Sequence, residues 1–329
     1  MNKTKICIIK LGALGDVVRT TPILEAIKEK YPHSEITWIT KPSSKEILED
    51  NNLIDKLLLL PHIPTDKFDI LYSLDIDEQA TKIANKIIAD EKYGFYDNEG
   101  FPASFNEEAE YYLNTVFDDY LKKSNRKTYQ EMIFDMCKLH WKKQPISIKI
   151  SEQARQNISD FIEENNIQGK ILGFNIGSSP RWPSKAWHKS RIIEFIKDIH
   201  KDYTVILLGG PEEIESMEEV EKELDNIGIK VYAKNTSNSL KDFFALIDIC
   251  DVIVCADTLA LHLALGLNKP TIALFLCTPA WEIEDYDLAK KITSPIFDNF
   301  FPERMDQYDE ELVKSISVNQ VLKALSDLE

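Results

Sequence analysis

The chain has 329 residues, 43% of them hydrophobic and 29% charged, and carries a formal net charge of −16 at pH 7. This length exceeds one ordinary core and predicts two globular domains, and the acidic balance argues against nucleic acid as the main partner. No apolar run approaches the about 20 residues of a membrane helix, and the N-terminus lacks the apolar segment of a signal peptide. Five cysteines without a CxxC pair are typical of free thiols, so we expect a cytoplasmic protein.

The first predicted element is an apolar strand over 5–10, followed by a glycine turn and a helix over 17–31. Ligands of open α/β sheets bind at the carboxyl ends of strands, where this turn lies. Gly12 and Gly15 would let the backbone approach a ligand, and Asp16 would stand at the mouth of a cleft. The alternative is that Asp16 only caps the helix.

The rest of the first half alternates strands with helices over short connections, which predicts parallel βαβ units. The expected strands cover 35–40, 56–60 and 68–74, and the expected helices lie near 43–51 and 77–89. From about 91 to 145 the sequence becomes aromatic, and we predict helices inserted into a first domain of residues 1–150.

An amphipathic helix over 151–165 opens a second α/β series, which predicts a second doubly wound domain over 151–308. Its expected strands cover 171–177, 203–210, 229–233, 251–257 and 270–275, and its helices cover 188–201, 239–248 and segments starting at 212 and 258. Residues 309–329 form a closing helix, and packing of this helix back on the N-terminal domain is left open.

Three loops at strand ends of the second half carry polar residues. In the first, over 177–187, the hydroxyls of Ser178 and Ser179 and the charge of Lys185 suit a phosphorylated ligand, while Trp182 and Trp187 are expected as anchors.

The second loop, over 209–213, has paired glycines and ends at Glu213. This acid either accepts hydrogen bonds from ribose hydroxyls or favours the start of the next helix.

The third loop opens the helix that starts at 258. Asp257 is placed to cap it, and His262 shares a face with Thr258 by its four-residue spacing. A packed core histidine is the alternative for His262.

Residues 121–149 hold eight Lys or Arg against two acids. This basic segment is either a solvated face or a surface toward an anionic acceptor or membrane. The sequence has no HxH, HExxH or Cys/His cluster, so we expect no metal site. It also lacks the GxSxG, GxGxxG and P-loop signatures.

Taken together, these motifs resemble glycosyltransferase family 9, the bacterial lipopolysaccharide heptosyltransferases. The opening KLGALGDVVRTTP is similar to that family's strand followed by GD-V/I-L/V-x-T/S-x-P, and GSSPRWPSKAWH to its loop with W-P-x-K-x-W. LLGGPEE matches GGPxE, and CADTLALHLALGLNKPTIALF resembles the family's D-T-G-x-x-H-L-A segment. SISVNQVLKAL resembles its closing helix. The similarity covers most of the chain and is weakest over 91–145.

The resemblance implies the GT-B fold, with two Rossmann-like domains facing across a cleft, the first for the acceptor and the second for a nucleotide sugar. It implies an inverting, metal-independent transfer, with ADP-heptose as donor substrate, no cofactor, and an anionic glycolipid or glycan as acceptor. Asp16 would be the general base, with Lys185 as the second catalytic residue. The residues implied for substrate binding are Gly12, Gly15, Ser178, Ser179, Glu213, Asp257, Thr258, His262 and Thr278.

The sequence departs from the family at two donor-side positions. Leu259 replaces a glycine, and the F-G-P-T loop reads Phe275-Leu276-Cys277-Thr278-Pro279. Two alternatives therefore stay open: a catalytically degenerate scaffold that binds nucleotide sugars, and a transferase that acts on another surface glycan or a protein. The basic segment 121–149 would give peripheral contact with the inner face of the cytoplasmic membrane.

Overall fold

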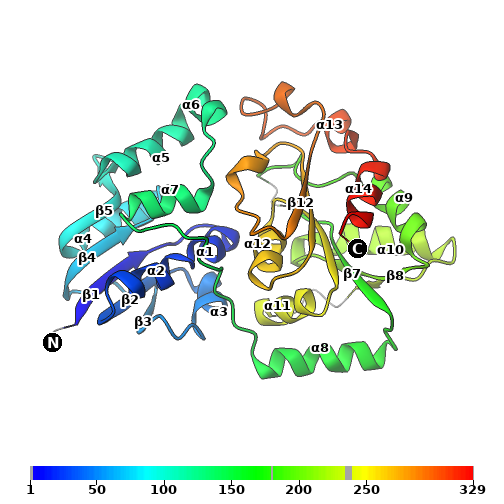
Figure 1. Cartoon of the computed structure of the whole chain (residues 1–329), viewed down its shortest axis with the longest axis horizontal. Helices are drawn as coiled ribbons and strands as arrows, with labels where there is room; N and C mark the ends of the chain where they lie inside the picture. The colour runs from blue at the N-terminus through cyan, green and yellow to red at the C-terminus, as the bar shows by residue number, and fades with distance from the viewer. Residues whose placement is uncertain (1–2, 179–180, 234–238, 329) are drawn as a thin grey trace. The chain divides into compact units, whose positions relative to one another are not determined.

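The computed structural model describes residues 3–178, 181–233 and 239–328. The chain divides into two compact units, the first comprising Met1–Lys149 with Trp281–Glu284 and the second Ile150–Ala280 with Asp285–Glu329. Each unit contains one six-stranded sheet with its own helices, so each is α/β (Figure 1).

The sheet of the first unit has the order β3-β2-β1-β4-β5-β6. Pairing is parallel from β3 to β5, and β6 is antiparallel to β5. The strand order reverses between β1 and β4, which makes this edge the topological switch point where such sheets bind ligands. The strands are β1 Thr4–Ile9, β2 Ser34–Thr40, β3 Lys56–Leu59, β4 Lys67–Ser73, β5 Ile88–Asn98 and β6 Phe101–Ser104.

Seven α-helices accompany this sheet in the described part of the first unit. The helix predicted over 17–31 is split into α1 and α2, because Pro22 has no N–H to continue the ladder of α1. A 3₁₀ turn over Pro42–Ser44 leads into α3. The helices are α1 Leu14–Thr20, α2 Ile23–Lys30, α3 Lys45–Leu48, α4 Glu78–Lys86, α5 Glu107–Phe117, α6 Asp119–Ser124 and α7 Tyr129–Met136.

The prediction of helices from residue 91 onward is wrong for residues 91–104, which form β5 and the hairpin to β6. Gly94 lies so close to β4 that a Cβ there would come within 1.8 Å of the Ser73 carbonyl oxygen. Glu99 and Gly100 both have positive φ, as a two-residue hairpin turn requires. Residues 91–104 of the predicted helical insertion are therefore strands, and its first helix begins at Glu107.

The second sheet is parallel throughout, with the order β12-β11-β10-β7-β8-β9 and a switch point between β7 and β10. β12 was not predicted, because its sequence AKKIT is charged and half-exposed at the sheet edge. The strand expected over 229–233 shortens to two residues. The strands are β7 Lys170–Asn175, β8 Tyr203–Leu208, β9 Tyr232–Ala233, β10 Val252–Ala256, β11 Thr271–Phe275 and β12 Ala289–Thr293.

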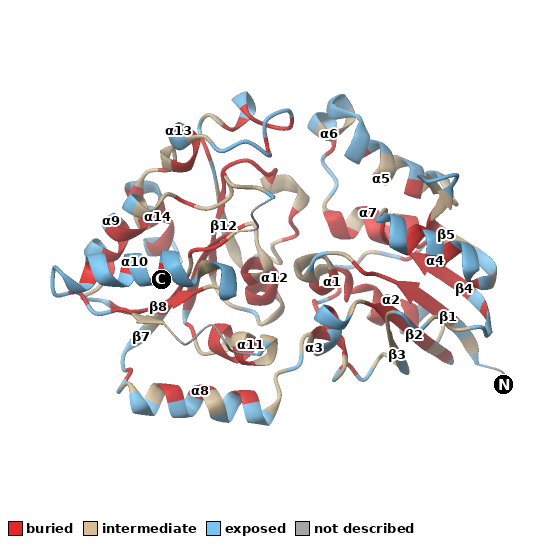
Figure 2. Ribbon diagram, turned by 180° about the vertical axis from the view of Figure 1, so that it is seen from behind, coloured by how far each residue is buried: buried red, intermediate tan, exposed pale blue. Residues whose placement is uncertain are grey.

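The closing segment forms two short helices instead of one, because Ser317 starts a new helix with a capping box to Gln320. Val321 and Leu325 of the last helix join the apolar core of the second unit, where buried residues concentrate in the strands and inner helix faces (Figure 2). The α-helices of this unit are α8 Glu152–Glu164, α9 Lys189–Ile199, α10 Ile214–Asp225, α11 Leu240–Asp248, α12 Leu259–Gly266, α13 Glu310–Lys314 and α14 Val318–Ser326. Further 3₁₀ turns cover Pro211–Glu213, Ala280–Glu282 and Phe297–Asn299.

Candidate functional site

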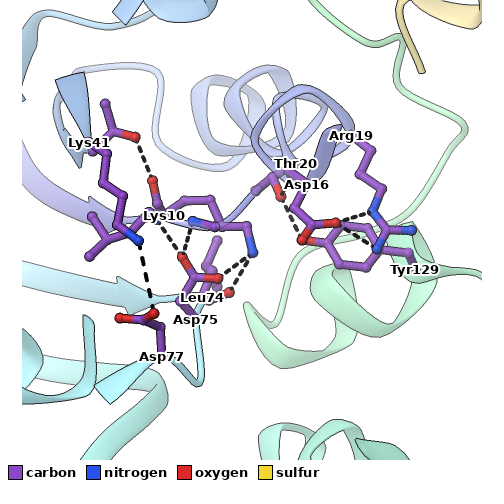
Figure 3. Close-up of polar contacts among 12 residues, drawn as sticks. Lys10, Asp16, Arg19, Thr20, Lys41, Leu74, Asp75, Asp77 and Tyr129 are labelled. Atoms are coloured by element: carbon purple, nitrogen blue, oxygen red, sulfur yellow. Dashed lines mark hydrogen bonds and ion pairs between the residues drawn. The ribbon is translucent and has the colours of Figure 1, made fainter. Parts of the chain in front are cut away.

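The switch point of the first sheet holds a buried ion pair. Lys10 Nζ, just past β1, lies 2.6 Å from Oδ1 of Asp75, which follows β4 (Figure 3). The other carboxylate oxygen of Asp75 accepts hydrogen bonds from the backbone N–H groups of Leu11 and Gly12. The pair therefore holds the turn between β1 and α1 in place.

Electrostatics keep Lys10 charged in this buried place. Burial opposes the ammonium form, but attraction to Asp75, Tyr129 and Asp16 outweighs it and raises the pKa of Lys10 well above its ordinary value. A Cβ at Gly12 would lie 3.0 Å from Asp75 Oδ1 and 3.2 Å from Lys10 Nζ. A side chain at this position would crowd the ion pair, and the role of Gly12 in ligand approach stays a prediction.

Asp16 lies in the first turn of α1, which begins at Leu14 after the N-cap Ala13. The alternative that Asp16 is the helix cap is therefore wrong. Its Oδ1 accepts from Arg19, at 3.0 Å from Nε and 2.8 Å from Nη2. The Asp16 side chain is 35% exposed, so it reaches the surface at the edge where ligands are expected. Gly15 precedes it in the same turn and is half-buried.

Arg19 and Tyr129 are two neighbours of Asp16 that sequence reasoning missed. The Arg19 guanidinium lies 3.8 Å from the centroid of the Tyr129 ring. Thr20 Oγ1 donates to the Asp16 carbonyl oxygen at 2.6 Å and shares a 2.7 Å hydrogen bond with the Tyr129 hydroxyl. Arg19 could have been found from its i+3 spacing to Asp16 on a predicted helix. Tyr129, on α7, gave no signal.

In the second unit, Lys185 and Asp257 form an ion pair. Lys185 Nζ lies 3.0 Å from Asp257 Oδ2 and donates to the Asp257 carbonyl oxygen at 2.8 Å. His262 is buried, and its Nε2 lies 3.8 Å from Asp257 Oδ1. The prediction that Asp257 caps α12 is wrong, since Thr258 is the N-cap residue. Three predicted site residues are brought together instead.

Asn175 bridges the switch point of this sheet. Thr258 Oγ1, after β10, donates to Asn175 Oδ1 at 3.1 Å, and Asn175 Nδ2 donates to the Leu208 carbonyl oxygen at 3.2 Å. Asn175 was missed, although a polar residue that ends an apolar strand was a readable signal. Thr278 is buried beyond β11. The pKa of its neighbour Cys277 is raised to about 11 by burial, with Lys185 opposing.

Glu213 closes the turn after β8. Its Oε2 accepts from the Gly210 N–H at 2.7 Å, and a Cβ at Gly177 would lie 2.3 Å from its Cδ. Glu213 thus packs on the loop after β7, and its hydrogen bond from the Gly210 N–H stabilises the turn before α10. A contact with ribose stays a prediction.

The loop after β7 is described only in part. Ser178 Oγ donates to the Trp182 carbonyl oxygen at 3.5 Å, and Ser179 lies outside the described residues. Trp187 is confirmed as an anchor, because it is buried against Phe174 and donates from Nε1 to the Ile316 carbonyl oxygen at 3.0 Å.

Within residues 3–178, 181–233 and 239–328, no group of three or more His, Cys, Asp or Glu is arranged to hold a metal ion. In the same part of the chain, each helix is too short or too polar to cross a membrane.

The sequence and the fold of the chain are similar to those of known proteins. The model of glycosyltransferase family 9 (heptosyltransferase) matches residues 112–299, more than half of the chain. The chain belongs to this family. It is 28% identical to lipopolysaccharide heptosyltransferase 1 of Campylobacter coli over 98% of both chains.

Solved structures of the family share the fold. A family 9 glycosyltransferase from Veillonella parvula has a TM-score of 0.78 at 21% identity, with 99% of this chain and 97% of that chain covered. The E. coli ADP-heptose lipopolysaccharide heptosyltransferase II has a TM-score of 0.71 at 19% identity, with 98% of each chain covered. The predicted α/β fold of the GT-B class is confirmed, and the protein is a glycosyltransferase.

Proposed function

We propose that this family 9 member is an inverting glycosyltransferase that moves heptose from ADP-heptose onto a lipopolysaccharide core. The observation that carries the proposal is the match to the Campylobacter coli heptosyltransferase, which spans nearly the whole of both chains. The E. coli relative that is named for ADP-heptose supports this donor. Charged side chains at both switch points add chemical support.

In the proposed reaction, Asp16 is the general base. Its carboxylate takes the proton of the acceptor hydroxyl while that oxygen forms a bond to the anomeric carbon of heptose. The bond from that carbon to the phosphate oxygen breaks, and ADP leaves with the electron pair. One displacement inverts the anomeric centre. Proton removal of this kind contributes about 10²–10⁴-fold in rate.

The second unit would bind the donor. The Lys185 ammonium offsets the charge that develops on the departing diphosphate, and hydroxyl and backbone N–H groups of the neighbouring loops donate hydrogen bonds to it. We expect this electrostatic support to serve without a metal ion or cofactor. The residues assigned to donor binding are Ser178, Ser179, Glu213, Asp257, Thr258, His262 and Thr278.

We further propose that the enzyme acts in the cytoplasm, at the inner membrane face, through the basic segment 121–149. Lys123, Arg126 and Lys127 of this segment are exposed, and the segment is basic in a chain with a net charge of −16. Anionic lipids attract such segments. Vesicles with and without anionic lipid, separated by flotation, test the contact. Equal recovery on both would contradict it.

The transfer is tested with purified protein, ADP-heptose and a heptose-free lipopolysaccharide acceptor. We expect acceptor-dependent ADP release and a product heavier by one heptose. Asp16→Asn should lower kcat about 10²–10⁴-fold while calorimetry shows unchanged ADP binding. The matched control is Glu25→Gln, an acid in the first turn of the next helix, with activity like the wild type. Donor binding without any transfer would contradict the proposal and favour a scaffold.

A further inference from the structure

We propose that Arg19, held against the ring of Tyr129, is a positioning residue that keeps the Asp16 carboxylate ionised and aimed. The inference rests on the proposed role of Asp16 as the base. Arg19 stands at the unspecified position of the opening motif, and Tyr129 lies outside the motifs that pointed to the family.

The first step is the geometry of the Arg19–Asp16 pair. Two nitrogens of one guanidinium, Nε and Nη2, lie within 3.0 Å of the same oxygen, Asp16 Oδ1 (Figure 3). Two donors on one atom restrict rotation of the carboxylate more than a single hydrogen bond does. A guanidinium stays protonated at every pH of interest, so it favours the ionised carboxylate throughout.

The second step is that Arg19 is itself held. Its side chain is 18% exposed, and its guanidinium lies 3.8 Å from the centroid of the Tyr129 ring. Stacking on an aromatic face suits the planar guanidinium, and it restricts a side chain that would otherwise move freely at a surface.

The third step is that Tyr129 is rigid. It is buried, and its hydroxyl is tied to Thr20 Oγ1 on the helix that carries Asp16. Tyr129 is also the first residue of α7, whose start is fixed by a capping box between Thr128 and Glu131. The support for Asp16 thus comes from a packed element of the first unit.

The nearby lysine has a different partner. Lys10 Nζ lies 5.9 Å from the centroid of the same Tyr129 ring, but it is 2.6 Å from Asp75 Oδ1. Lys10 therefore holds the backbone turn and acts on Asp16 only through electrostatic attraction, whereas Arg19 contacts the Asp16 carboxylate directly. Only the Arg19 pair is expected to affect the chemical step without affecting the turn.

The test uses four variants of the full chain. Arg19→Gln removes the guanidinium and should lower kcat about 10–100-fold with the KM of both substrates within about twofold, because misplacing a catalytic group by about 1 Å costs about 10²-fold. Arg19→Lys should recover part of kcat. Tyr129→Leu should behave like Arg19→Gln, and Tyr129→Phe, which keeps the ring but loses the bond to Thr20, should give a kcat between those of Tyr129→Leu and the wild type.

Arg191→Gln is the matched control. Arg191 pairs with Glu194 at 2.9 Å with the same i,i+3 spacing, on α9 of the second unit. Its loss should leave kcat unchanged. ADP binding and the thermal midpoint of every variant report whether the chain has folded. If Arg19→Gln does not fold, Arg19→Lys is the variant that tests the proposal.

The outcomes separate the two proposals. Wild-type kcat in Arg19→Gln, together with an inactive Asp16→Asn, would overturn the positioning role and leave the base in place. A raised acceptor KM at unchanged kcat would assign Arg19 to acceptor binding and also overturn it. Full activity of Asp16→Asn would remove the proposed base, and the role of Arg19 with it.

Discussion

The two switch points differ in how their charged residues serve stability and the proposed chemistry. In the first unit, the buried pair Lys10–Asp75 holds the backbone, and the proposed base Asp16 is a separate, more exposed carboxylate. In the second unit, Lys185 and Asp257 are at once the ion pair of the loop and the residues assigned to the donor. Stability and chemistry are thus divided between residues in one unit and combined in the other.

The difference has a physical origin. A general base must be ionised and reach solvent or substrate, so it cannot also be a deeply buried structural partner. A lysine that binds diphosphate can form an ion pair with an aspartate and still interact with the ligand through its positive charge. A substitution in the first unit should therefore lower either stability or activity. A substitution of Lys185 or Asp257 in the second unit should lower both stability and donor binding.

The largest effect is expected for Lys10→Met. This change leaves Asp75 buried without its cation, which typically destabilises a protein by about 3–5 kcal/mol. Urea unfolding measures the loss. Lys28→Met breaks a more exposed pair with Asp55 and should cost about 0–1 kcal/mol. An equal loss of unfolding free energy in Lys10→Met and Lys28→Met would show that the buried Lys10–Asp75 pair stabilises the fold no more than an exposed pair does.

Lys185→Met comes next. Loss of a charged hydrogen bond to diphosphate, worth about 1.5–3 kcal/mol, should weaken ADP binding about 10–100-fold. The thermal midpoint should fall as well, because Asp257 loses its ion pair with Lys185. Lys269→Met, which removes the weaker contact to Asp248, should leave ADP binding unchanged. An unchanged midpoint in Lys185→Met would contradict the combined role.

The stability that Lys10 contributes should depend on pH. Because its folded pKa is raised well above 10.5, its contribution is present in full below that ordinary value. It is lost as pH rises from there through the folded pKa, at up to about 1.4 kcal/mol per pH unit. The difference in unfolding free energy between wild type and Lys10→Met should stay constant from pH 7 to 10 and narrow above 10.5. Narrowing below pH 9 would contradict this.

The smallest effect is expected for Leu259→Gly. Leu259 is the half-buried first residue of α12, where the family has glycine. The substitution should change ADP affinity less than about threefold and destabilise the helix by about 0.5–1 kcal/mol. Calorimetry with ADP measures the affinity. A gain of tenfold or more would mean that the leucine obstructs the donor.

Local patterns predicted most of the fold. Apolar strands that alternate with helices identified both sheets, because burial on two faces leaves a periodic trace in the sequence. The pattern failed at β5, which pairs with β4, and at β6, which pairs with β5. It also failed at β12, whose charged residues are tolerated at a sheet edge.

The sequence by itself determined the two α/β series, the family, and the glycine turn that presents Asp16, since all three depend on residues close together in the chain. Tertiary structure alone decided the partners. Asp75 reaches Lys10, Tyr129 reaches Arg19, and Lys185 reaches Asp257 only after strands distant in sequence have paired. The local sequence around a charged or aromatic residue does not indicate its distant partner, because the contact forms only when the sheet and its helices pack.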